Sequence, residues 1–142
     1  TGKDITNYPG AGAAGGMGGG LLAFFNAELK PGTELLLKAI DFSEKIKGAD
    51  LIITGEGKAD RQTAMGKVPY GILKEAQKEH IPVIVLAGSI ENLPELNKAG
   101  FKGIFSIAPG PITLEKAMEP EFAKENITRL VSQLYSVITS FG

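Results

Sequence analysis

Charged residues and glycines crowd the stretch that follows a short apolar run near the middle of the chain. Glu56, Lys58 and Asp60 alternate with small residues, and Gly55 and Gly57 flank the first of them. Carboxylates suit Mg²⁺, an ammonium group suits phosphate, and glycine lets a ligand approach the backbone closely. The alternative is a solvated turn whose charges pair with one another. By residue type alone, the two interpretations are evenly balanced.

The position of this stretch favours a functional role. The apolar run at residues 51–54 shows no polar alternation, which predicts a strand that is buried on both faces and stops at Gly55. Ligands of open parallel sheets bind beyond the carboxyl ends of the strands. Glu56, Asp60 and Lys58 are therefore candidate catalytic residues, and the two carboxylates are candidate metal ligands. The neighbouring glycines, Gly55 and Gly57, are candidate phosphate-binding residues.

A second apolar run, at residues 83–86, ends just before Gly88 and Ser89. These two residues are candidates for the same ligand-binding edge, although a serine at a strand end is more often a helix cap. A Walker P-loop is excluded, because Lys58 and Lys67 each follow a glycine but neither is followed by serine or threonine.

A glycine-rich run occupies residues 10–20 and leads directly into an apolar helical pattern. Gly10, Gly12 and Gly15 match the dinucleotide fingerprint, but that fingerprint needs an apolar strand before it, and the preceding residues are polar. This argues against a nicotinamide or flavin site. Two interpretations stay open: a helix start that packs closely against a neighbour, and an anion site at a helix N-terminus, in which Gly16 would also take part.

The order of the apolar patterns predicts an α/β fold with a parallel sheet flanked by helices, in a Rossmann-like three-layer arrangement. We expect a single α/β unit over residues 1–142. Three strands are few for so many helices, and the first helices have no strand before them, so an N-terminal part of the protein is expected to be missing. The expected strands are 51–54, 83–86 and 103–107, and the expected helices are one within 10–30, a broken one from about 33, 69–80, 93–99, a short one from about 114 and one from about 120.

The last helix carries an apolar stripe that we interpret as core, part of it facing a missing domain. The stripe consists of Ile127, Leu130, Val131, Leu134, Ile138 and Phe141. Met17, Met65 and Met118 are also interpreted as packing residues.

The overall composition excludes several classes of protein. Fifteen basic and sixteen acidic residues give a net charge of −1, which indicates no nucleic-acid footprint. No apolar run approaches the roughly 20 residues of a membrane span. The chain has no cysteine, which excludes disulfides and thiolate zinc sites and fits a reducing cytoplasm. The only histidine, His80, lies at a predicted helix end, so a Ser-His-Asp triad is not credible.

Taken together, the motifs resemble the glycerate kinase family of the bacterial glycerate 2-kinase type. The resemblance covers essentially the whole chain, but only the C-terminal portion of a family whose members are more than twice as long. Tyr70 and residues 91–93 depart from the usual pattern. The matching motifs are PGAGAAGGMG at 9–18, TGEGKAD at 54–60 with Gln62 and Thr63, GKVP at 66–69, LAGS at 86–89, FSI at 105–107 and GP at 110–111.

The resemblance implies phosphorylation of D-glycerate with ATP and Mg²⁺, at a site between two α/β lobes. It implies that Glu56 and Asp60 supply a Mg²⁺ contact or the base that accepts the hydroxyl proton. Lys58 and Lys67 would contact phosphates or the substrate carboxylate. Backbone N–H groups of residues 10–16 would bind an anion.

The competing hypotheses are a non-catalytic ligand-binding lobe, or a fragment without activity of its own; a dinucleotide-binding oxidoreductase ranks third. The expected partners are glycerate, a nucleotide and the N-terminal part of the same protein, with a homo-oligomer left open. The kinase hypothesis requires that Glu56, Ser89 and Gly12 lie on the same rim of the molecule.

Overall fold

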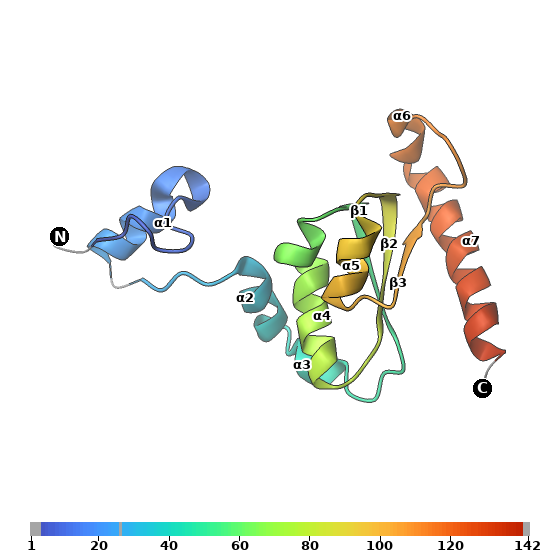
Figure 1. The fold of residues 1–142 in the computed structure, drawn as a ribbon, viewed down its shortest axis with the longest axis horizontal. Helices are drawn as coiled ribbons and strands as arrows, with labels where there is room; N and C mark the ends of the chain where they lie inside the picture. Colours follow the sequence, from blue (N-terminus) through green and yellow to red (C-terminus); the bar gives the residue numbers. More distant parts are fainter. Residues whose placement is uncertain (1–3, 26, 141–142) are drawn as a thin grey trace. The chain divides into compact units, whose positions relative to one another are not determined.

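The computed structural model describes residues 4–25 and 27–140 and divides into two compact units, residues 1–36 and 37–142 (Figure 1). The expectation of a single α/β unit remains a prediction, and each unit is described here by itself. The elements, in chain order, are α1 (Ala13–Phe24), α2 (Gly32–Ala39), α3 (Phe42–Lys45), β1 (Ile52–Ala59), η1 (Thr63–Met65), α4 (Val68–Lys78), β2 (Val83–Ile90), α5 (Leu93–Ala99), β3 (Gly103–Ser106), α6 (Leu114–Ala117) and α7 (Pro120–Thr139).

The larger unit is built on a parallel sheet with the strand order β1-β2-β3. Each pair of neighbouring strands is joined by a crossover that contains a helix, α4 after β1 and α5 after β2, as parallel pairing requires. Figure 1 shows α4 and α5 on one side of the sheet and α7 on the other. The α/β class, the parallel sheet and the flanking helices are therefore confirmed.

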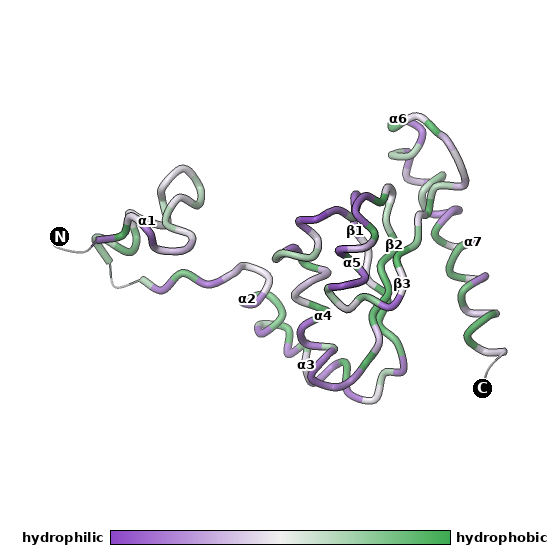
Figure 2. Tube along the Cα trace, viewed as in Figure 1, coloured by the Kyte–Doolittle hydropathy of each residue, from purple (hydrophilic) through white to green (hydrophobic). Residues whose placement is uncertain are grey.

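The main core lies between the sheet and helices α4 and α5. Val83 and Val85 of β2 are fully buried there, against Leu73 of α4 and Leu96 of α5. The opposite face of β2 is buried as well, since Ile84 and Leu86 are 7% and 8% exposed, and the first half of the strand is strongly apolar (Figure 2). The prediction of burial on both faces is thus confirmed for β2.

The same prediction is wrong for β1. Its side chains alternate between buried and exposed positions, and Ile53 is 45% exposed. The reason is the face on which it lies: Ile53 pairs with Ile84, so it is on the face of the sheet opposite to Val83 and Val85, and within the larger unit its side chain is left exposed.

Both β1 and β2 run further than their apolar sequences predict. Strand β1 does not stop at Gly55, because the parallel register continues from Gly55 opposite Leu86 as far as Ala59 opposite Ile90. Backbone pairing with a neighbouring strand does not require apolar side chains, so the strand continues through charged residues. Glu56, Lys58 and their neighbouring glycines therefore lie on a strand, and only Asp60 lies in the loop after it.

Helix α7 is less buried than its apolar stripe predicts. Ile127 and Ile138 are exposed, and Leu130, Val131 and Leu134 are only half-buried, while Phe141 lies outside the described residues. At the start of α7, Phe122, Ala123 and Asn126 line a small cavity together with Ile107, Ala108 and Ile112, which follow β3. The interpretation of the stripe as core is therefore wrong within the described chain. No helix of the described part, α7 included, combines the length and the apolar character needed to cross a membrane.

In the smaller unit, the glycine-rich run forms a broken helix. Gly15 and Gly16 have φ values of 68° and 93°, which glycine adopts readily, and they interrupt α1. A Cβ atom on Gly18 would come 2.5 Å from the carbonyl oxygen of Gly10, so this helix packs directly on the preceding loop. This close contact supports the packing interpretation of the later glycines. The anion site at Gly10, Gly12, Gly15 and Gly16 stays a prediction.

The position of the main core can be tested by measuring the stability of variants. Replacing Leu73, which is 2% exposed, with alanine should lower the free energy of unfolding by about 2–5 kcal/mol, because a cavity would replace its contacts. The same change at Leu114, which is 75% exposed, should cost less than about 0.5 kcal/mol. Urea denaturation followed by circular dichroism would measure both, and equal losses would show that the core is placed wrongly.

Candidate functional site

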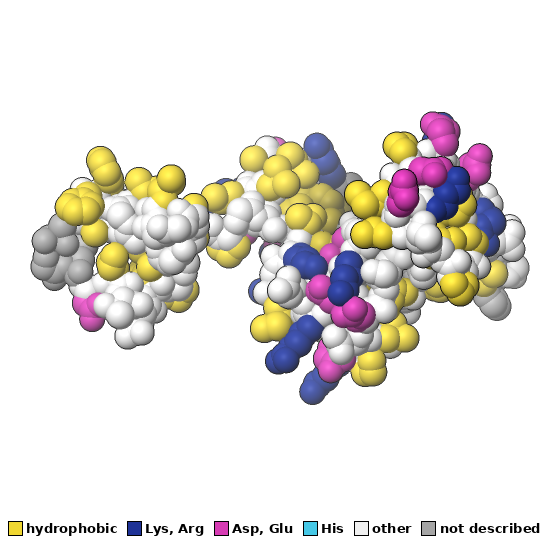
Figure 3. Space-filling model, turned by 90° about the horizontal axis from the view of Figure 1, so that it is seen from above, with side chains coloured by type: hydrophobic (Ala, Val, Ile, Leu, Met, Phe, Trp, Pro, Cys, Tyr) yellow, Lys and Arg dark blue, Asp and Glu magenta, His cyan; other side chains and the backbone are white. Residues whose placement is uncertain are grey.

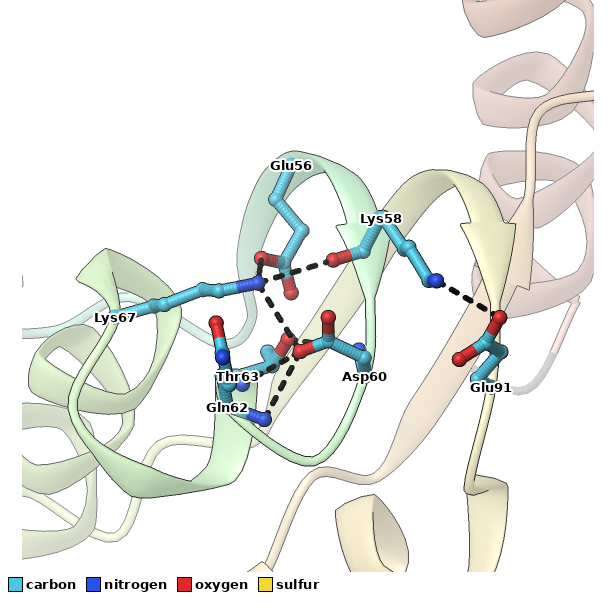
Figure 4. Close-up of polar contacts among 7 residues, drawn as sticks. All are labelled: Glu56, Lys58, Asp60, Gln62, Thr63, Lys67 and Glu91. Carbon is cyan, nitrogen blue, oxygen red and sulfur yellow. Dashed lines mark hydrogen bonds and ion pairs between the residues drawn. The ribbon is translucent and has the colours of Figure 1, made fainter.

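The carboxyl end of β1, the loop after it and the start of α4 bring three of the candidate residues together. Glu56 lies on β1, Asp60 follows the end of that strand, and Lys67 is the residue directly before α4. Figure 4 shows the Lys67 side chain extending across the loop toward both carboxylates. The cluster is thus built from the end of β1 and the start of α4, which are separated in sequence only by a short loop that contains η1.

Lys67 is the centre of this cluster. Its Nζ atom lies 3.1 Å from Oδ1 of Asp60 and 3.7 Å from Oε2 of Glu56. It also donates a hydrogen bond of 3.5 Å to the backbone carbonyl of Lys58. One ammonium group therefore contacts two carboxylates at the end of the strand and partly offsets their negative charge.

The loop after β1 is held by reciprocal hydrogen bonds between its two ends. The backbone N–H of Asp60 donates to Oγ1 of Thr63 at 2.9 Å, and the N–H groups of Gln62 and Thr63 donate to Oδ1 of Asp60 at 2.9 and 3.3 Å. Thr63 is completely buried. The Asp60 carboxylate is therefore fixed in position by the backbone of its own loop as well as by Lys67.

These contacts keep Asp60 ionised. The hydrogen bond from Lys67 is the largest cause that lowers the pKa of the Asp60 carboxyl below its usual value. Desolvation opposes it, and the N–H groups of Gln62 and Thr63 each add a smaller lowering effect. An acid of lowered pKa is a poor proton acceptor, so Asp60 is better suited to binding and positioning than to general-base catalysis.

Glu56 differs from Asp60 in one respect. Its side chain is only 11% exposed, and its Oε1 atom is buried without a hydrogen-bond partner in the described structure. A buried carboxylate oxygen without a partner is costly, and such atoms call for an explanation such as a ligand, an ion or a catalytic role. Glu56 is thus the member of the cluster with a free acceptor.

Lys58 does not join this cluster through its side chain. Its ammonium group extends in the other direction, toward Glu91, and Nζ lies 2.8 Å from Oε1 of that residue (Figure 4). The hydrogen bond that Lys58 donates to Glu91 raises the pKa of Lys58, so the side chain stays cationic. The two candidate cations are therefore placed on different sides of the strand end.

A cleft of about 730 Å³ opens beside the strand ends. Figure 3 views this unit from above and shows acidic and basic side chains close together, with hydrophobic side chains beside them. The volume is within the range of sites for small organic ligands. The residues that line the cleft are Glu56, Gly57, Lys58, Gly88, Ser89, Ile107, Ala108, Gly110, Pro111, Ile112, Leu114, Ala117 and Met118.

The structure brings most of the candidate residues of the larger unit to one edge. Five of them line the cleft, whereas Gly55 is not among the lining residues. Lys67 lies next to the cleft through its ion pair with Glu56, and Asp60 is joined to Lys67 by a second ion pair. Gly10, Gly12, Gly15 and Gly16 belong to the other unit, so their place relative to the cleft stays a prediction.

Sequence reasoning missed the second wall of the cleft. Ile112, Leu114 and Met118 line it, and the interpretation of Met118 as a packing residue is wrong, because it is 72% exposed. The signal that could have found this wall is its position: the segment follows β3, and the carboxyl ends of parallel strands share one edge. Thr63 and Glu91, which hold Asp60 and Lys58, were also missed as supporting residues.

The position of Lys67 predicts how Asp60 titrates. Replacing Lys67 with methionine should raise the pKa of Asp60 toward the usual value for aspartate, because its main stabilising contact is lost. In the wild type, the ionised Asp60 stabilises the fold above the usual aspartate pKa, and this contribution is lost as the pH falls through the lowered value. Carboxyl ¹³C NMR titration would measure the change. Lys78→Met, which removes only a contact to Glu75, should leave Asp60 unaffected, and an unmoved Asp60 in the Lys67 variant would contradict the assignment.

Comparison with known proteins gives a consistent result. The model of the glycerate kinase family matches residues 1–139. The chain is 44% identical over 135 residues to a glycerate kinase from Bacillus cereus, covering 94% of this chain and 35% of that protein. It is 42% identical over 127 residues to the glycerate 2-kinase of Escherichia coli K12, covering 89% of this chain and 33% of that one.

A solved structure agrees with these sequence relatives. The crystal structure of a Salmonella typhimurium LT2 protein assigned as glycerate kinase 2 superposes with a TM-score of 0.63 at 37% identity, covering 92% of this chain and 34% of that one. The chain thus spans about a third of the length of the curated relatives it matches. The chain belongs to the glycerate kinase family.

Proposed function

We propose that this chain forms part of a longer kinase that transfers the γ-phosphoryl group of ATP to a hydroxyl group of D-glycerate. The observation that carries the proposal is the position of Glu56, which lines the cleft at the strand ends and also contacts Lys67 of the ion-pair cluster. Phosphoryl transfer depends on positioning and charge stabilisation, and this edge supplies carboxylates, ammonium groups and exposed backbone together.

Glu56 is the residue best suited to accept the proton of the substrate hydroxyl. Its Oε1 atom has no other partner, whereas the corresponding oxygen of Asp60 is bound by Lys67 and two backbone N–H groups. In the proposed step, the hydroxyl proton moves to Oε1, the hydroxyl oxygen forms a bond to the γ-phosphorus, and the bond between that phosphorus and the departing ADP oxygen breaks. Asp60 then has the role of orienting Lys67.

The two lysines have separate roles in this proposal. Lys67 lies between the carboxylates and offsets their charge, so that an anionic substrate can approach Glu56. Lys58 lines the cleft and is held only by an exposed ion pair with Glu91. Exposed ion pairs are weak, so a phosphate group entering the cleft can replace Glu91 as the partner of Lys58.

Mg²⁺ is the expected cofactor, and the residues present fit it. Among the described residues, no group of three metal-binding side chains exists, but Mg²⁺ in kinases is typically held by one or two carboxylates together with substrate phosphates. The carboxylate of Asp60 and Oε2 of Glu56 are the groups that would hold it, and Oε1 of Glu56 would stay available as the proton acceptor. When bound, the ion would neutralise charge on the phosphates. The Lys67 ammonium now lies near both carboxylates, so cation binding would require it to shift.

The remaining expectations form part of the same proposal. The backbone of residues 10–16 would bind an anionic group of the substrates, and the rest of the longer protein would close the site. A cytoplasmic location, which the lack of cysteine suggests, belongs here as well. The competing hypothesis is a lobe that binds ligand without catalysis. It is retained because the chain covers only about a third of the length of its relatives. Assaying the isolated chain and the native protein that contains it with ATP, Mg²⁺ and glycerate would distinguish the two.

The proposed roles predict the effect of two isosteric variants. Glu56→Gln should lower kcat by about 100-fold or more in the native protein that contains this chain, because it removes the proton acceptor. Asp60→Asn should also lower kcat, because Lys67 would lose its closer carboxylate. Glycerate-dependent formation of ADP would measure both. Glu125→Gln, on the exposed surface of α7, is the matched control and should retain wild-type kcat. Near-normal kcat in the first two variants would remove these residues from the mechanism.

The metal proposal has its own test. Removal of divalent cations with EDTA should abolish glycerate-dependent ADP formation, and added Mg²⁺ should restore it. In the Glu56→Gln variant, the Mg²⁺ concentration that gives half-maximal activity should rise, because one of the two carboxylates would no longer be charged. An unchanged Mg²⁺ requirement in that variant would show that Glu56 does not contribute to the metal site.

A further inference from the structure

The cleft beside the strand ends has two walls of different chemistry. One wall is the polar edge of β1 and β2, with Glu56, Lys58 and Ser89. The other wall is formed by the segment that follows β3, where Ile112, Leu114 and Met118 present apolar side chains. A ligand that fits both walls must have an anionic or polar end and an apolar end.

The apolar side chains of the second wall are largely exposed, although apolar side chains of this size are usually buried. Leu114 and Met118 are 75% and 72% exposed, and they stand four residues apart on α6 and the residue after it, so they lie on the same side. Neither side chain belongs to the main core. Exposed apolar side chains grouped along a cleft are typical of a binding surface.

Gly57 on the opposite wall points to a ligand independently. A Cβ atom on this residue would meet no heavy atom within 4 Å, and its φ is outside the left-handed region, so neither packing nor backbone conformation requires glycine here. A glycine of this kind allows a ligand to approach the backbone closely. Lys58, the next residue, would place a positive charge beside that ligand.

We propose that this cleft binds ATP, with the nucleoside against Ile112, Leu114 and Met118 and the phosphates along Gly57, Lys58 and Ser89. The inference rests on the proposed kinase function and specifies which of the two substrates enters this cleft. Glycerate has a carboxylate and two hydroxyl groups and no apolar surface, so it does not match the second wall. A nucleoside has a flat, largely apolar base, and the cleft volume suits a ligand of this size.

This orientation also accounts for the position of Glu56. The residue lies on the polar wall and has its free oxygen at the edge of the ion-pair cluster. Phosphates that extend along the strand ends would bring the terminal phosphoryl group toward that cluster. The glycerate hydroxyl would then be bound on the side of Lys67 and Asp60, outside the apolar part of the cleft.

The test distinguishes the contribution of the nucleoside to ATP binding from the contribution of the phosphates. In the native protein that contains this chain, Leu114→Asn combined with Met118→Gln should weaken ATP binding about tenfold, the effect of losing modest apolar contacts. Binding of tripolyphosphate, which has the same phosphate chain and no nucleoside, should change less than about twofold, as should the KM for glycerate. Equilibrium dialysis would measure both ligands, and steady-state kinetics would measure the KM values. Val137→Asn, an exposed apolar position on α7 outside the cleft, is the matched control and should bind ATP as the wild type does.

Other outcomes would overturn the proposal. A raised KM for glycerate with unchanged ATP binding would place the acceptor substrate in the cleft. Equal loss of ATP and tripolyphosphate binding, or a lowered melting temperature with no selective loss of ATP, would show that the apolar wall packs against protein. If the wild type binds ATP but forms no ADP with glycerate, the proposed kinase function fails, while the dialysis results still decide whether the nucleoside binds here.

Discussion

The parallel pairing of β1 with β2 determines where every residue of the candidate site lies in the larger unit. Because the pairing continues to Ala59 opposite Ile90, the backbone of the charged stretch is fixed by hydrogen bonds between strands. Glu56 and Lys58 stand two residues apart, so they leave the same face of the strand. Their charged ends then diverge, Glu56 toward Lys67 and Lys58 toward Glu91, and the loop from Asp60 to Lys67 begins from a defined point. If this pairing ended at Gly55, the same charges would lie on a flexible loop.

A second constraint is the incomplete cover of the larger unit. One face of the sheet is packed under α4 and α5, but Ile53 of β1 and Ile127 and Ile138 of α7 are exposed. These apolar side chains lie on the surface of a chain that spans about a third of its relatives' length. The apolar stripe on α7 is therefore exposed in this part of the protein. The helical pattern predicts that the stripe packs against something, but it does not reveal whether the surface that covers it lies within residues 1–142.

The sequence was sufficient to predict the order of the elements and the edge of the sheet where candidate residues gather. Short apolar runs mark the three strands, and residues at their ends meet because the strands are parallel. It did not predict that β1 continues through Glu56 and Lys58, since strand length depends on the neighbour's backbone. Nor did it predict that Lys67 contacts both carboxylates while Lys58 binds Glu91, because such contacts depend on how α4 and the segment after β2 pack. The place of Leu114 and Met118 on the wall of the cleft was not predicted, because an apolar residue gives no sign in sequence of whether it faces a core or a cleft.

The close contact between the tips of β1 and β2 has a further consequence. A Cβ atom on Gly88 would lie 2.7 Å from the carbonyl oxygen of Gly57, so no larger residue fits there without separating the strands. The floor of the cleft at this point is consequently made of peptide groups, whose chemistry is the same whatever the sequence. Selectivity at this floor must therefore come from the side chains around it.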